Sequence, residues 1–409
     1  MRLLIFLALV FVSVQTFSKT DKYRLTLRDN PATSVVIGWN QVSGTNPVVY
    51  YGTTDNKDAW DKYEWNAKPD RTVAFAEMEN NFVRLNGLIP NTSYYFVIKD
   101  SEGVSKRYWF KTVPMDADSR LSFVAGGDSR NNPIPRRNAN MLVSKLKPHA
   151  VLFGGDMTSR GTPEQWQEWL NDWQLTISDD GRMYQLIAAR GNHEKTNEMI
   201  YHLFDVPSEQ VYYGITCGND FIRVYVLNTE ISIAGEQSDW LKNDLKEYKK
   251  THWKIAQYHK PMRPHVAGKA EGNGQYMEWA KLFYKEDVKL VVECDAHTVK
   301  TTWSLKPSTN SKSEEGFVRD DKKGTVYVGE GCWGAPLRPS DDAKSWTRDH
   351  GSFNQFKWIF VDKNRMEVRT IKVDNAEAVS SVPNDNPFII PDSLDVWTPE
   401  NGAVLEIRH

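Results

Sequence analysis

The sequence has few cysteines and no excess of charge of either sign. Only Cys217, Cys294 and Cys332 occur in 409 residues, which excludes a disulfide scaffold and allows at most one bridge. We expect all three to be small buried residues. Lysine and arginine total 51 against 53 aspartate and glutamate residues, for a formal net charge of -2. This balance argues against nucleic acid or an anionic membrane surface as the main partner, because both attract a basic excess.

Long hydrophobic runs are also lacking, except at the N-terminus. Residues 1–18, MRLLIFLALVFVSVQTFS, place one arginine before a run of apolar residues. A bilayer span needs about 20 apolar residues, so the run is short for an anchor and has the length of a secretory signal. A retained anchor or a buried strand is the alternative. We expect a signal peptide, no membrane span after its removal, and a periplasmic or secreted protein.

Residues 20–113 contain short alternating apolar runs separated by turn residues. Runs such as TSVVIGW and TSYYFVIKD each predict a strand, and their number predicts an all-β sandwich. The segment 88–95 resembles the corner of fibronectin type III domains, in which a tyrosine hydroxyl ties the loop to the strand. Trp39 would fill the core opposite this corner. Nothing in this domain indicates catalysis, so we expect a rigid accessory module.

From Leu121 onward the pattern changes. Continuous apolar runs now end in Gly, Asp, Asn or His, and helical stretches such as 137–147 and 163–173 lie between them. This alternation predicts an α/β catalytic domain over 119–375, with sheets buried on both faces. Residues 376–409 are rich in Pro, Asp and Asn, and we expect a tail that either packs on the domain or lies loose. Ligands in such folds bind at the carboxyl ends of the strands.

Polar side chains follow several of these strands. In chain order the motifs are Gly-Asp, Gly-Gly-Asp, Gly-Asn-His-Glu, a His and a late His, which supply Asp128, Asp156, Asn192, His193, Glu194, His259 and His297. Carboxylate, amide and imidazole groups are ligands that divalent metals accept. The glycines before them allow tight turns and a close approach of the backbone. The sequence therefore predicts a metal site at one rim of the sheets.

This series resembles the calcineurin-like metallophosphoesterases, and within them the purple acid phosphatases, which carry a fibronectin-like domain in front. The resemblance covers residues 23–372 and implies a four-layer α/β/β/α domain behind the sandwich. It implies that Asp156 bridges two metals, with Asn192 and His259 on the second and Asp128 and His297 on the first. It also implies that His193 contacts the phosphate and protonates the leaving oxygen, with Glu194 behind it.

The implied reaction is hydrolysis of a phosphomonoester or phosphodiester by metal-activated hydroxide. A metal ion lowers the pKa of bound water from about 15.7 toward neutrality. His193 can act as general acid, because the unperturbed pKa of histidine is about 6.5. We expect one or two divalent ions from among Mn, Mg, Ca, Zn and Fe. The expected substrate is a small-molecule or polymer-linked phosphate ester.

Three positions depart from the family pattern. Ser159 stands where purple acid phosphatases have an iron-binding tyrosine, and Arg130 stands where most other relatives have a histidine. Asp295 occupies the place of a histidine of the second site. Asp295 either binds a metal, which would favour Mn, Mg or Ca, or only orients a ligand or forms a salt bridge. Arg130 either replaces the charge of the first metal, binds substrate, or is an ordinary surface residue.

The remaining candidates are less constrained. His265 follows His259-Lys260-Pro261 in a loop that reaches the substrate in relatives, so it is a candidate substrate contact. Strand alternation turns Cys294 away from Asp295, which favours core packing. The missing ligands leave two alternatives: a catalytically degenerate binding module, or a single-metal hydrolase in which Arg130 replaces one metal. His193 favours an enzyme, because a binding module has no need of an acid.

Overall fold

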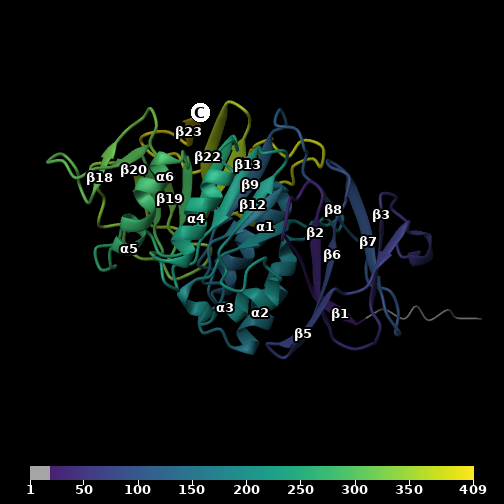
Figure 1. Ribbon diagram of the computed structural model, residues 1–409. Helices are drawn as coiled ribbons and strands as arrows, with labels where there is room; N and C mark the ends of the chain where they lie inside the picture. The colour runs from purple at the N-terminus through teal and green to yellow at the C-terminus, as the bar shows by residue number, and fades with distance from the viewer. Residues whose placement is uncertain (1–18) are drawn as a thin grey trace, which may run out of the picture.

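The chain folds into an all-β N-terminal part beside a larger α/β part (Figure 1). The computed structural model describes residues 19–409, so the expected signal segment lies outside the described residues. Within this described range, no helix is both long enough and apolar enough to cross a membrane. Its three cysteines are buried and form no disulfide, as expected from their small number.

The N-terminal domain is a sandwich of two four-stranded layers. One layer has the order β4-β3-β7-β8 and the other has the order β1-β2-β6-β5. Their bounds are β1 (Thr20–Thr26), β2 (Val35–Gln41), β3 (Val48–Gly52), β4 (Trp65–Ala67), β5 (Arg71–Phe75), β6 (Met78–Leu85), β7 (Ser93–Lys99) and β8 (Tyr108–Lys111). Trp39 is fully buried between the layers, as predicted. The predicted corner is also confirmed, because the Tyr94 hydroxyl accepts a hydrogen bond from the Ile89 backbone nitrogen at 2.8 Å.

The two domains share one sheet. Strand β1 pairs in parallel with β11 (Gln185–Ala188), with Leu25 opposite Gln185, and this pairing joins the front layer to the α/β domain. The result is a ten-stranded sheet with the order β23-β22-β21-β9-β10-β11-β1-β2-β6-β5. The sequence patterns predict two separate units, and they do not predict this continuity.

The part of that sheet that belongs to the α/β domain is built around three parallel strands. These are β9 (Leu121–Gly126), β10 (Ala150–Phe153) and β11, and the antiparallel strands β21 (Gln355–Val361), β22 (Arg365–Lys372) and β23 (Val404–Arg408) extend them. Strand β23 comes from the C-terminal tail, so the end of the tail packs as an edge strand rather than lying loose.

A second sheet of seven strands faces the first. Its order is β12-β13-β14-β15-β19-β16-β20, and β13 to β15 run parallel. The bounds are β12 (Tyr213–Cys217), β13 (Ile222–Val226), β14 (Trp253–Gln257), β15 (Leu290–Glu293), β16 (Val299–Thr302), β19 (Val326–Gly329) and β20 (Thr347–Gly351). A small hairpin of β17 (Leu305–Pro307) and β18 (Phe317–Arg319) lies beside them.

Alternate residues of the second sheet face two different cores. Val224 and Ile255 belong to the core that this sheet shares with the first sheet. Tyr225 and Ala256 point the other way, toward α4 (Glu236–Glu247) and α6 (Lys281–Lys285). The helices α1 (Pro133–Leu146), α2 (Pro163–Trp173) and α3 (Asn197–Phe204) pack with the first sheet. This is the predicted mixed α/β domain behind an all-β domain.

Helix α2 begins where the sequence predicts it, because Pro163 stands at its first position and the Thr162 hydroxyl accepts a hydrogen bond from the Gln165 nitrogen. Helix α1 begins at Pro133, four residues before the predicted start. Short turns complete the fold: η1 (Trp60–Lys62), η2 (Gln174–Thr176), η3 (Asn192–Glu194), α5 (Asn273–Gln275), the π-turn η4 (Tyr276–Ala280) and η5 (Ala376–Ala378).

Candidate active site

The predicted metal-binding residues meet at the carboxyl ends of five strands. Strands β9, β10 and β11 of one sheet and β14 and β15 of the other lead into the loops that carry them. Five of these loop residues have left-handed backbone conformations, with φ of 57° at Asp128, 49° at Arg130, 55° at Asp156, 66° at Asp295 and 57° at His297. Non-glycine residues rarely adopt positive φ, and such strain concentrates at functional sites.

Four side chains surround one point at the centre of this rim. His259 Nε2 lies 3.3 Å from Asp156 Oδ1, 3.2 Å from Asn192 Oδ1 and 3.7 Å from Asp295 Oδ1. Metal–ligand bonds of about 2.0–2.2 Å place neighbouring ligand atoms about 2.8–3.6 Å apart in octahedral or tetrahedral sites. The distances from His259 to Asp156 and Asn192 fall in this range, and the distance to Asp295 lies just above it.

A guanidinium group occupies the other side of Asp156. Arg130 Nη2 lies 2.7 Å from Asp156 Oδ2 and 3.3 Å from His297 Nε2. His297 Nε2 in turn lies 3.1 Å from Asp128 Oδ1. Asp156 thus turns one oxygen toward His259 and the other toward Arg130. Arg130 is part of the site and is not a surface residue.

The donor set fits a divalent cation. Ligand atoms of Asp128, Asp156 and His259 all lie within 4.8 Å of one another, and all three residues are buried. Within residues 19–409, the buried Asp128 Oδ1 accepts no well-formed hydrogen bond. Burial alone would lower the pKa of His259, but the carboxylates of Asp156 and Asp128 raise it well above 6.5. A site that holds a proton this firmly has an excess of negative charge that a metal ion would balance.

Residues 121–300 match the family model described as calcineurin-like phosphoesterase, and residues 20–112 match that of the purple acid phosphatase N-terminal domain. Residues 121–300 therefore form a calcineurin-like phosphoesterase domain. This domain places the chain among hydrolases that act on phosphoric ester bonds. A comparison with curated protein sequences gave no significant match.

Two solved structures share the fold of this phosphoesterase over most of its length. Purple acid phosphatase PPD1 from yellow lupin (Lupinus luteus) seeds superimposes with a TM-score of 0.72 at 16% identity, covering 91% of this chain and 76% of the lupin chain. The structure of PhoD gives a TM-score of 0.68 at 12% identity, covering 94% of this chain and 91% of the PhoD chain. At these identities the likeness concerns the fold alone.

His193 sits beside the four converging side chains of this phosphoesterase. Its Nδ1 contacts the Ser159 carbonyl, which can only accept, and lies 3.2 Å from Arg130 Nη1, which can only donate. The shorter contact to the carbonyl places the proton on Nδ1. This leaves Nε2, which lies 3.9 Å from Asp156 Oδ2, as the nitrogen that can exchange a proton. Burial, with a smaller effect from Arg130, lowers the pKa of His193 below 6.5, although Asp156 acts in the opposite direction.

Glu194 lies under the site and does not touch the pocket. Its fully buried carboxylate accepts hydrogen bonds from the backbone nitrogens of Asp156 at 2.9 Å, Met157 at 2.7 Å and Gly191 at 2.6 Å. It therefore fastens the loop after β10 to the loop after β11. This placement makes Glu194 a positioning residue rather than a group that reaches substrate.

The glycine pairs make room for a sulfur atom. A Cβ added at Gly154 would lie 2.3 Å from Cys294 Sγ, and one added at Gly127 would lie 2.7 Å from the same atom. Cys294 is buried, which raises the pKa of its thiol to about 12. The side chain packs beneath the site as the strand alternation predicts.

The structure does not bring His265 to the pocket. The side chain is fully buried, and its Nε2 is 2.7 Å from Thr347 Oγ1, while its backbone nitrogen donates to Glu330. Burial, with help from Lys300 and Lys344, lowers the pKa of His265 to about 2, so it is neutral. His265 supports the loop and is not a substrate contact here.

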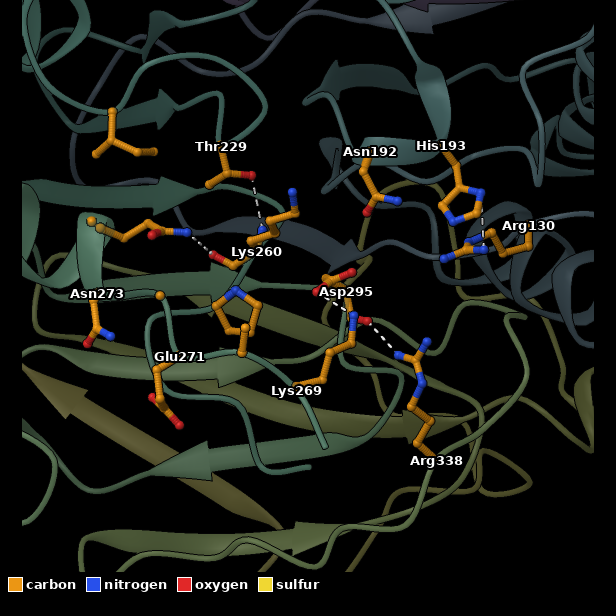
Figure 2. Close-up of a pocket in the computed structure, with 16 residues that line it drawn as sticks. Arg130, Asn192, His193, Thr229, Lys260, Lys269, Glu271, Asn273, Asp295 and Arg338 are labelled. Carbon is orange, nitrogen blue, oxygen red and sulfur yellow. Dashed lines mark hydrogen bonds and ion pairs between the residues drawn. The ribbon is translucent and has the colours of Figure 1, made fainter. Parts of the chain in front are cut away.

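Three cationic residues that the sequence analysis did not propose for the site also line it. A cavity of about 700 Å³ is bordered by Arg130, Asn192, His193 and Asp295, and also by Lys260, Lys269 and Arg338 (Figure 2). Lys269 Nζ lies 2.6 Å from Asp295 Oδ2, so Asp295 has one oxygen toward His259 and one toward Lys269. These residues lie in irregular loops, where no periodicity could have identified them.

Proposed function

We propose that the protein is an exported, metal-dependent phosphoesterase in which His193 protonates the leaving oxygen of a phosphomonoester or phosphodiester. The observation that carries this proposal is the convergence of Asp156, Asn192 and His259 at ligand-like distances beside His193. The apolar composition of residues 1–18 supports export, to the periplasm or outside the cell. The substrate is a small-molecule or polymer-linked phosphate ester.

The metal ligands in this proposal are Asp156, Asn192, His259 and Asp295, with Asp128 and His297 on the far side. A divalent ion held there would polarise the phosphoryl oxygens and lower the pKa of a nearby water. Asp156, Asp295 and Asp128 supply hard oxygen donors, which suit Mn, Mg or Ca, while the histidines also accept Zn or Fe.

The side chains perform the rest of the chemistry. The Arg130 guanidinium, held by Asp156 at 2.7 Å, can donate hydrogen bonds to phosphoryl oxygens and stabilise the charge that develops there. His193 donates its proton from Nε2, because Nδ1 is committed to the Ser159 carbonyl. Glu194 keeps the two loops in register without touching the ester.

The test is turnover of p-nitrophenyl phosphate and bis-p-nitrophenyl phosphate by metal-stripped protein reloaded with Mn, Mg, Ca, Zn or Fe. We expect metal-dependent hydrolysis that His193→Ala reduces by at least about 100-fold. His252→Ala is the matched control, because His252 precedes β14 and lies at the opposite end of that strand from His259. No detectable hydrolysis of either ester by the folded wild-type protein with any of these metals would contradict the proposal.

A second candidate is a single-metal hydrolase in which Arg130 replaces the first metal. It is favoured by the position of Arg130 Nη2, within 3.3 Å of both Asp156 and His297. Charge supports it as well, because Arg130 and Lys269 already neutralise part of the charge of Asp156 and Asp295.

Metal stoichiometry separates these candidates. Elemental analysis of active wild-type protein should give one ion per chain in the single-metal case and two in the other. In the single-metal case, Arg130→His, which restores the residue found in most relatives, should allow a second ion to bind. Binding of metal and inorganic phosphate without turnover would instead identify a catalytically degenerate binding module.

A further inference from the structure

Arg338 lies at the edge of the catalytic pocket with most of its hydrogen-bond donors unused. Its backbone nitrogen donates to the His297 carbonyl at 3.0 Å, and its Nη1 donates to the Asp295 carbonyl at 2.8 Å. The first bond ties the backbone at Arg338 to the loop after β15, and the second directs the side chain toward the same loop. A guanidinium carries several N–H donors in a planar fork, and the Asp295 carbonyl uses only one of them.

The other charged side chains of the pocket wall are paired. The pairs and their distances are Arg130–Asp156 at 2.7 Å, Lys260–Glu230 at 2.8 Å, Lys269–Asp295 at 2.6 Å and Glu271–Arg263 at 3.4 Å. Across the described chain, residues 19–409, no carboxylate forms an ion pair with Arg338. Figure 2 shows Arg338 beside Lys269 and Asp295, on the same side of the pocket as Arg130 and His193. The unpaired cation therefore adjoins the place where the ester would react.

We propose that Arg338 binds the extra ionised oxygen of a phosphomonoester and makes the pocket selective for monoesters over diesters. This inference rests on the proposed function, because it concerns the substrate of the same site. A monoester keeps one more ionised oxygen than a diester, in which an alkyl group covers that oxygen. The planar fork of arginine matches a pair of phosphate oxygens, and charge-assisted bonds of this kind are about twice as strong as neutral ones.

The first test compares two substrates with the same leaving group. These are p-nitrophenyl phosphate and methyl p-nitrophenyl phosphate, assayed with metal-loaded wild-type protein, Arg338→Gln and Arg338→Lys. We expect Arg338→Gln to lower kcat/KM for the monoester by about 10-fold to 100-fold, mostly through KM, and to change that of the methyl ester by less than about threefold. Arg338→Lys keeps the charge without the fork and should recover part of the loss.

Arg160→Gln is the matched control. Arg160 is exposed and lies outside the pocket, so its removal takes away the same charge without removing the proposed contact. We expect it to leave the ratio of monoester to methyl ester turnover unchanged. An equal loss for both substrates in Arg338→Gln would overturn the proposal, because a residue that only supports the loop affects both alike. An unchanged monoester rate would overturn it too.

A binding measurement keeps this inference distinct from the proposed function. Calorimetric titration with phenylphosphonate, a dianion that cannot be hydrolysed, should show at least about tenfold weaker binding to Arg338→Gln than to wild-type protein. Loss of this binding in a protein without turnover would support the role of Arg338 and contradict only the catalytic proposal. Equal affinity for wild type and variant, or no affinity in either, would refute the role of Arg338.

Discussion

Replacing Glu194 tests the frame that holds the active site. Glu194 is fully buried, and its carboxylate accepts three backbone N–H groups at 2.6 to 2.9 Å, two from the loop after β10 and one from the loop after β11. Glutamine has nearly the same shape but only one acceptor oxygen. In Glu194→Gln that oxygen can keep the bonds to Asp156 and Gly191, while the amide group turns its own hydrogens toward the nitrogen of Met157.

The expected loss of stability follows from the number of buried N–H donors that each substitution leaves without an acceptor. Each buried donor left without a partner costs about 1–3 kcal/mol. Glu194→Gln leaves the Met157 nitrogen and the new amide without acceptors, so we expect a loss of about 2–6 kcal/mol in unfolding free energy. Glu194→Ala leaves all three backbone donors without an acceptor and also opens a cavity, so we expect a loss of about 3–9 kcal/mol.

Urea unfolding followed by tryptophan fluorescence measures this loss, and turnover at saturating metal measures its effect on the site. Glu198→Gln is the matched control, because it makes the same chemical change at an exposed position four residues away. Surface changes of this type stay within about 0.5 kcal/mol. If Glu194→Gln also stays within 0.5 kcal/mol of wild type, the carboxylate does not hold the two loops together.

Three further predictions concern sterics, charge and pH. A Cβ at Gly191 would lie 2.3 Å from Asp156 Oδ1, so Gly191→Ala should weaken metal binding by at least about tenfold in a metal titration. Gly268→Ala is the control, because a Cβ added there meets nothing within 4 Å, and it should leave metal affinity unchanged. Asp205 is buried against three partly exposed arginines. Asp205→Asn should lower the unfolding free energy, measured in urea, by about 2–3 kcal/mol. A loss below about 0.5 kcal/mol would show that water solvates the arginines and that the pairs contribute little. Burial lowers the pKa of Lys357 to about 7 from 10.5, so between these values the unfolded chain binds more protons and stability rises with pH. The difference in unfolding free energy between pH 7 and pH 9 should be about 2 kcal/mol smaller in Lys357→Met than in wild type. An equal difference in both proteins would contradict the lowered pKa.

The sequence predicts the centre of the site well because each key residue is tied to the end of a strand. Asp128, Asp156, Asn192 and His259 directly follow buried apolar runs, and parallel strands bring their carboxyl ends to one rim. The same logic predicts the inward packing of Cys294. For these residues, the local sequence pattern and the rule that parallel strands end at one rim are sufficient to predict their positions.

The other parts of the candidate site depend on loops and on long-range contacts, which produce no periodic pattern in the sequence. Lys269 and Arg338 lie in irregular segments, and only the folded chain brings them to Asp295, 26 and 43 residues away. His265 shows the opposite failure, because its place in a motif suggested a substrate contact while the surrounding side chains bury it. Arg130 was identifiable as unusual, but sequence gives no distance to Asp156 and so could not decide among its roles.

The parallel pairing of β1 with β11 constrains how this protein can be divided. Strand β11 leads toward Asn192 and His193 of the candidate site, so the front domain supplies the neighbour of a strand that positions these residues. Deleting residues before Leu121 would expose an apolar strand in the middle of a sheet, where bare edges invite aggregation. The two domains are therefore not interchangeable parts. A chimera that takes the α/β domain from this protein and the front domain from a relative therefore needs a strand that can pair with β11 in the place of β1.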